Sequence, residues 1–177
     1  PEIAIELASD ALSQRSISSA IREAKEFGDE PALATAQILE DVVEELAERH
    51  LAEDKEEELI KPEELSRSLS EELEREGVEL EPLRLSELLM EIGEKHIVQR
   101  IREGRAPRSY LRRMGGFLEK WILTSGETQF IHLISRSSGR GRQPVIRLEI
   151  QALDPRLVTR PLIEGAYTTI SMSGTLV

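Results

Sequence analysis

Apolar residues recur at helical spacing through the first 125 residues of the chain. The clearest stripe occupies 39–51 at intervals of three and four residues, opposite a face of Asp and Glu, and predicts a helix of about five turns. Ser13 is typical of a helix cap and Gly28 of a helix stop, so a shorter helix is predicted over 14–27. His50 falls on the apolar stripe and is interpreted as a residue at the edge of the core.

Three further helices are predicted after a charged run at 52–58, which itself is interpreted as a solvated helix end or a loop. Pro62 fits the first position of a helix because it lacks an N–H, and Gly77 marks the end. The next helix covers 85–102, and the last covers 108–123.

The last of these helices has two different faces. Trp121 shares the apolar face and is interpreted as a core residue, whereas Arg108 and Arg112 point nearly opposite. Gly115 and Gly116 lie in the middle of this helix, where each costs up to about 1 kcal/mol relative to Ala. Either a kink or a close approach by backbone or ligand explains them, and the sequence leaves both open.

After Gly126 the apolar period changes from helical spacing to alternation, which is typical of strands. Strands are predicted at 128–136, 145–151 and 167–172, with a short helix over 154–164. A strand–helix–strand order predicts two parallel strands. The predicted fold class is therefore a mainly α-helical bundle with a small α/β portion of three strands and one helix at the C-terminus.

Charge is divided unevenly along the chain. The whole sequence has 34 acidic and 23 basic residues, which argues against nucleic-acid binding, but residues 1–94 carry a net charge of −19 and residues 95–177 carry +8. The argument therefore excludes nucleic-acid contact only for the first part. The chain has no cysteine, its three histidines are widely spaced, and no apolar stretch is long enough for a membrane span, so we expect no metal and a soluble, intracellular protein.

The densest functional signal is a basic segment at 100–113, opposed only by Glu103. Its six arginines are Arg100, Arg102, Arg105, Arg108, Arg112 and Arg113. Such a segment is typical of a surface that follows a phosphate backbone. The other interpretation is that the arginines pair with the acidic first part of the chain, and charge alone does not decide between the two.

The C-terminal run resembles the stretch that leads into helicase motif III in the XPD family of superfamily 2 DNA helicases. The resemblance rests on Asp154-Pro155-Arg156-Leu157-Val158-Thr159-Arg160-Pro161, a strand ending Ile170-Ser171-Met172, and Ser173-Gly174-Thr175-Leu176. Residues 1–24, with Leu12-Ser13-Gln14-Arg15-Ser16-Ile17, look like the segment that follows the Asp-Glu-Ala-His box of that family. Between these landmarks the family inserts a mostly helical Arch domain.

The resemblance implies flanks of the first motor domain at 1–12 and 126–177 around an Arch domain at 13–125. It implies an archaeal, ATP-dependent 5′ to 3′ helicase of DNA repair, including nucleotide excision repair, with ATP, Mg and an iron–sulfur cluster in the parent protein. The Arch domain would help to enclose single-stranded DNA. Its partners would be the remaining motor and iron–sulfur domains. In the motif, Ser173, Gly174 and Thr175 would couple ATP hydrolysis to DNA movement.

The sequence also limits these expectations. The chain has no phosphate loop, no Asp-Glu-Ala-His box and no cluster cysteine, so we expect no ATPase activity and no cofactor for this piece alone. It begins at Pro1 without Met and ends in the run 170–177, which suggests a piece of a larger protein. We expect that protein to be cytoplasmic, or nuclear if it is eukaryotic. In the alternative reading, the acidic helices at 31–76 dock a regulatory protein and the chain makes no nucleic-acid contact.

Overall fold

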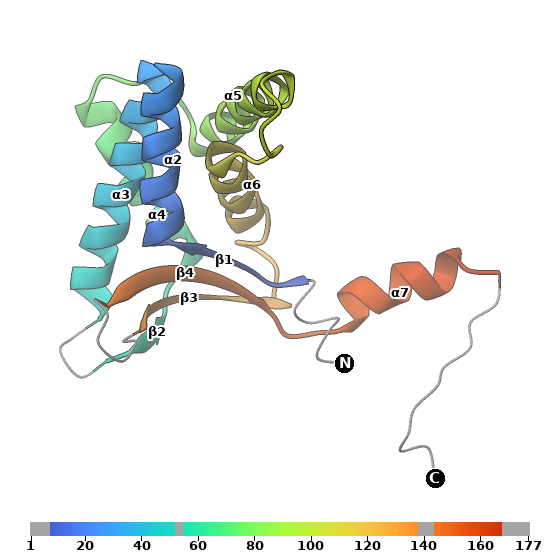
Figure 1. Cartoon of the computed structure of the whole chain (residues 1–177). Coiled ribbons are helices and arrows are strands. Elements are labelled where there is room, and N and C mark those ends of the chain that lie inside the picture. Colours follow the sequence, from blue (N-terminus) through green and yellow to red (C-terminus); the bar gives the residue numbers. More distant parts are fainter. Residues whose placement is uncertain (1–7, 52–54, 138–143, 168–177) are drawn as a thin grey trace, which may run out of the picture.

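Helices stand on one face of a small, curved antiparallel sheet in the computed structural model, which describes residues 8–51, 55–137 and 144–167 (Figure 1). Within these ranges the helices are α2 (Gln14–Phe27), α3 (Glu30–His50), α4 (Pro62–Arg75), α5 (Pro82–Arg102), α6 (Tyr110–Leu123) and α7 (Arg156–Gly165). The strands are β1 (Asp10–Ser13), β2 (Glu57–Leu59), β3 (Phe130–Ser137) and β4 (Val145–Ala152). The predicted fold class, mainly helical with a small sheet, is confirmed.

The helix ends follow the local signals in the sequence. The Ser13 side chain accepts a hydrogen bond from the backbone N–H of Ser16 (3.2 Å) at the start of α2, and Gly28 ends that helix with a φ of 68°. The Asp29 carboxylate then caps α3 by accepting from the N–H of Ala32 (3.1 Å). Both caps satisfy backbone groups that a helix terminus leaves without partners.

The described part of the sheet is antiparallel, and the predicted parallel βαβ unit stays a prediction. The strand order is β1-β4-β3-β2, and every pair within the described residues is antiparallel. Both edges of β4 are paired, one with its hairpin partner β3 and the other with β1. The third predicted strand, 167–172, lies outside the described residues except for Tyr167, which is not in a strand.

Two edge strands were not predicted. β2 overlaps the end of the charged run at 52–58, which was interpreted as a helix end or loop. It forms because β3 offers backbone partners: the N–H of Arg136 donates to the carbonyl of Glu56 (2.7 Å), and that of Ile60 donates to the carbonyl of His132 (3.0 Å). β1, which pairs with β4, includes residues on both sides of the domain boundary that was predicted between residues 12 and 13. The division into three domains stays a prediction.

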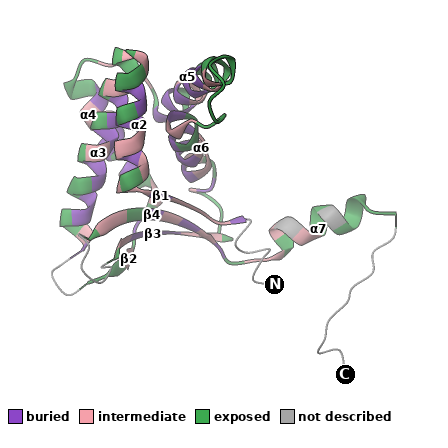
Figure 2. Ribbon diagram, viewed as in Figure 1, coloured by how far each residue is buried: buried purple, intermediate pink, exposed green. Residues whose placement is uncertain are grey.

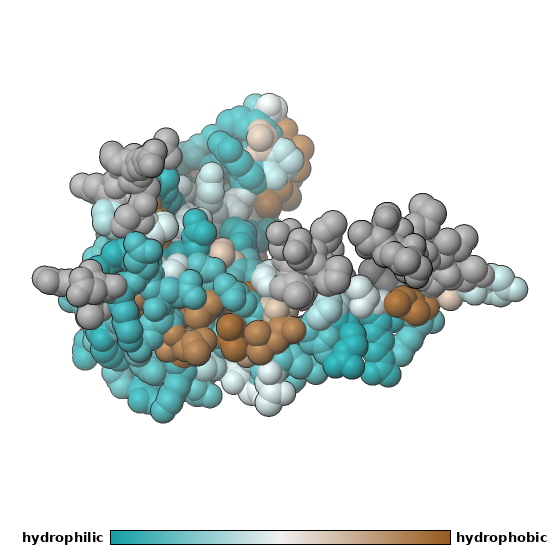
Figure 3. All heavy atoms as spheres, turned by 90° about the horizontal axis from the view of Figure 1, so that it is seen from below, coloured by the Kyte–Doolittle hydropathy of each residue, from teal (hydrophilic) through white to brown (hydrophobic). Residues whose placement is uncertain are grey.

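A single apolar core fills the space between the helices and the upper face of the sheet (Figure 2). Trp121 is fully buried at its centre, and its indole N–H donates to the carbonyl of Pro62 (2.9 Å). From the sheet, Ile134, Leu148 and Ile150 face this core. No described helix covers the opposite face of the sheet, and an apolar patch interrupts the hydrophilic surface there (Figure 3).

His132 provides a test of this core by pH. It is 4% exposed, it packs edge-on against Trp121, and its Nε2 lies 3.0 Å from the Thr124 hydroxyl. Burial lowers the pKa of His132 from its ordinary value of 6.5, although a hydrogen bond with the Trp121 backbone and the charge of Glu63 act in the opposite direction.

As pH falls below 6.5, the unfolded chain therefore takes up this proton before the folded protein does. We expect the free energy of unfolding to fall by up to about 1.4 kcal/mol per pH unit from this group. Urea unfolding at several pH values between 5.5 and 7.5 should show a shallower decline for His132→Gln than for the wild type. Equal pH dependence of the two proteins would contradict the assignment.

No helix in the described part of the chain is both long and apolar enough to cross a membrane.

Candidate nucleic-acid interface

The six arginines of the basic segment surround one corner of the molecule, where α5 ends and α6 begins. Arg100 and Arg102 belong to the last turn of α5. Arg105 and Arg108 lie in the connection between the helices, and Arg112 and Arg113 lie near the start of α6. The structure therefore brings together the residues that the sequence singled out, but it gives them different surroundings.

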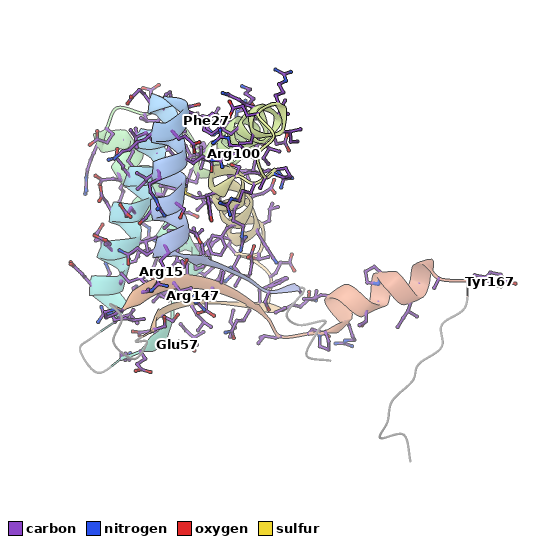
Figure 4. The ribbon with its side chains drawn as sticks, in the orientation of Figure 1. Arg15, Phe27, Glu57, Arg100, Arg147 and Tyr167 are labelled. Carbon is purple, nitrogen blue, oxygen red and sulfur yellow. The ribbon has the colours of Figure 1, made fainter. Side chains whose placement is uncertain are left out.

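Arg100 and Arg105 turn toward the end of α2. Arg100 lies 2.8 Å from the Glu26 carboxylate, and Arg105 contacts the same carboxylate. Both guanidinium groups also lie over the ring of Phe27, at 5.3 and 5.7 Å from its centroid, and Figure 4 shows Arg100 beside that ring. The hydrogen bond from Arg105, helped by the charges of both arginines, lowers the pKa of Glu26. These two arginines are thus paired with a carboxylate of the protein itself.

Arg113 and Arg112 differ in the strength of their ion pairs. Arg113 donates to both oxygens of Asp10, at 2.5 and 3.0 Å, and to the carbonyl of Ala11, so it ties α6 to β1. Arg112 Nε reaches Glu94 at 3.4 Å, and both side chains are more than half exposed. A long, solvated pair of this kind contributes little.

Arg102 and Arg108 are the remaining two. Both are exposed, and neither has a carboxylate partner within the described part of the chain. Arg102 also lines an open groove of about 540 Å³ on the outer face of α5, together with Val98, which is 48% exposed. Internal pairing therefore accounts for four of the arginines and leaves these two available to a ligand.

The connection that carries Arg105 and Arg108 is anchored by a buried carboxylate that sequence reasoning missed. Glu23 of α2 accepts hydrogen bonds from the Ser109 hydroxyl (2.6 Å) and the backbone N–H of Tyr110 (2.6 Å), and His96 Nδ1 lies 3.0 Å away. Its side chain is 1% exposed. A signal was present in the sequence, because Glu23 interrupts the apolar face of α2 between Ala20 and Ala24.

The residues predicted from motif III, Ser173, Gly174 and Thr175, lie outside the described residues. Among the residues that the structure describes, no group of three or more His, Asp or Glu side chains could hold a metal ion. The candidate interface is a surface of arginines, some of which pair with exposed carboxylates at the same corner.

No model of a known protein family matches the chain, and no curated protein matches it. The resemblance to XPD helicases accordingly stays a prediction.

Proposed function

We propose that this chain is the DNA-guiding module of an ATP-dependent helicase of the XPD type. The α5–α6 corner contacts single-stranded DNA through Arg102 and Arg108, with Arg112 beside them. The observation that carries the proposal is the exposure of Arg102 and Arg108 without a carboxylate partner in the described chain. Phosphate groups can approach these two guanidinium groups without first breaking an ion pair.

Charge explains how such a corner could act without chemistry of its own. Each phosphate that an arginine neutralises releases counterions from the nucleic acid, so the attraction is independent of base sequence and falls as salt rises. Two or three contacts give weak binding, which suits a surface past which a strand must move. In the proposed parent protein, the motor domains would bind ATP and Mg and would supply the movement.

Fluorescence anisotropy with a labelled oligothymidylate tests the proposal on the chain itself. We expect salt-dependent binding that weakens roughly tenfold at low salt in the double variant Arg102→Ala/Arg108→Ala. The slope of log affinity against log salt should fall by about 1.4, because a single strand contributes about 0.7 for each phosphate contact.

A matched control removes two exposed positive charges elsewhere. Arg49→Ala/Arg67→Ala changes the net charge of the protein equally but lies on α3 and α4. This control should bind nearly as well as the wild type. If it loses as much affinity as the first double variant, the binding reflects net charge and the corner is not an interface.

The acidic helices support the alternative, a docking surface for a regulatory protein, less well. Several of their carboxylates already fasten α3 to α2: Glu44 accepts from Gln14 (2.6 Å) and Glu40 accepts from Ser18 (2.8 Å). The carboxylates that pair with the basic segment also lie outside 31–76. Glu40 and Glu44 therefore have a structural role that requires no partner protein.

A further inference from the structure

Glu26 binds two arginines that differ in their access to solvent. The side chain of Arg100 is only 12% exposed, whereas that of Arg105 is 39% exposed and that of Glu26 is 42% exposed. Arg105 follows Gly104, whose φ of 70° turns the chain out of α5, and it also contacts Glu103 (2.5 Å). Arg100 is therefore packed in place, and Arg105 stands at the rim of the corner.

The acceptor that Arg105 now uses can be replaced by chemistry of the same kind. A guanidinium fork binds a carboxylate or a phosphate through the same paired N–H groups. An ion pair between exposed partners in water is weak, and phosphate oxygens can compete for it. Phe27 lies beneath both guanidinium groups. The Arg105 guanidinium can therefore stay stacked on this ring whether it binds a carboxylate or a phosphate.

We propose that Arg105 is a masked phosphate contact, and that Glu26, with Glu103 beside it, is an internal competitor that occupies Arg105 until a phosphodiester group of single-stranded DNA takes its place. This inference rests on the proposed function, because it extends the same corner from Arg102 and Arg108 toward α2. Glu26 then lowers the affinity of the corner and helps a bound strand to leave. Arg100 stays in place as the fixed partner of Glu26.

The substitution Glu26→Gln removes one of the two carboxylate charges that Arg105 contacts, leaving Glu103 in place, and it keeps the shape of the side chain. We expect it to strengthen binding of a labelled oligothymidylate roughly two- to fivefold, the range expected when an exposed ion pair no longer competes. The salt slope should steepen by about 0.7, which corresponds to one additional phosphate contact. Glu48→Gln is the matched control, because it makes the same change in net charge at an exposed position on α3.

A double-mutant cycle assigns the gain to Arg105. The gain from Glu26→Gln should disappear in Glu26→Gln/Arg105→Ala, while Arg105→Ala alone should change the affinity little because that arginine is masked in the wild type. Circular dichroism of each variant checks that the helices remain. A gain that survives in the double variant, or an equal gain in Glu48→Gln, would overturn the masking role.

The outcomes separate this inference from the proposed function. If the wild type binds through Arg102 and Arg108 and Glu26→Gln binds no more tightly, the interface stands and the masking role is wrong. If only Glu26→Gln binds, Glu26 is a mask and the assignment of Arg102 and Arg108 is wrong. If neither protein binds, both proposals are overturned.

Discussion

Replacing Glu23 by Ala should lower the free energy of unfolding by about 3 kcal/mol, the lower end of the range for breaking a buried charged contact. The substitution leaves the Ser109 hydroxyl, the Tyr110 N–H and His96 without their shared acceptor in a buried place. It also removes a negative charge from the positive end of the α6 dipole. Urea unfolding followed by circular dichroism measures the effect.

Two further variants serve as comparisons for Glu23→Ala. Glu48→Ala, at an exposed position of α3, should change stability by no more than about 0.5 kcal/mol. Glu23→Gln keeps one acceptor oxygen but loses the charge, so its effect should fall between the two. If Glu23→Ala is as stable as Glu48→Ala, the buried carboxylate does not anchor the start of α6. Failure of Glu23→Ala to fold would agree with the expected loss, because small proteins have only about 5–15 kcal/mol of stability.

Replacing Gly115 by Ala should destabilise the protein by about 1–3 kcal/mol, the usual cost of overpacking a tight contact. A Cβ atom at this position would lie 2.6 Å from the carbonyl oxygen of Ser86 and 2.9 Å from Met90 Cγ. The first of these atoms is backbone, so α5 and α6 would have to move apart. Of the two explanations that the sequence left open, the structure shows the close approach of a backbone, and α6 runs unbroken through the glycine pair.

The neighbouring glycine is the natural control. A Cβ atom on Gly116 would meet nothing closer than Met90 Sδ at 3.9 Å, which is an ordinary contact. Gly116→Ala should therefore stabilise the protein by up to about 1 kcal/mol through the better helix propensity of alanine. Thermal and urea unfolding of the two single variants should show shifts of opposite sign. Shifts of the same sign would mean that the α5–α6 contact does not decide the identity of residue 115.

The predicted helices agree with the structure to within a few residues. Helix α5 begins at Pro82 where 85 was expected, and α6 begins at Tyr110 where 108 was expected. His50 is partly buried, as expected for the edge of the core, and its Nε2 lies 2.8 Å from Glu64. These predictions succeeded because caps, glycine stops and apolar stripes act between residues a few positions apart.

The candidate site was predictable only in part. The sequence located the arginines, but it could not distinguish Arg102 and Arg108 from Arg100 and Arg105, because the difference lies in a carboxylate on another helix. Glu26 is 74 residues from Arg100 along the chain. Sequence spacing contains no information on such a pairing unless the packing of α2 against α5 and α6 is known.

By itself, the sequence determined where α2 begins and ends, that α6 has an apolar and a basic face, and that positive charge collects after residue 95. Each of these properties depends on residues that are neighbours along the chain. Only the tertiary structure decided that β2 is a strand, that Glu23 is buried, and which arginines pair with carboxylates. The physical reason is that a backbone partner, a desolvated carboxylate and an ion pair each require two distant segments to meet, and packing of the whole core sets which segments do.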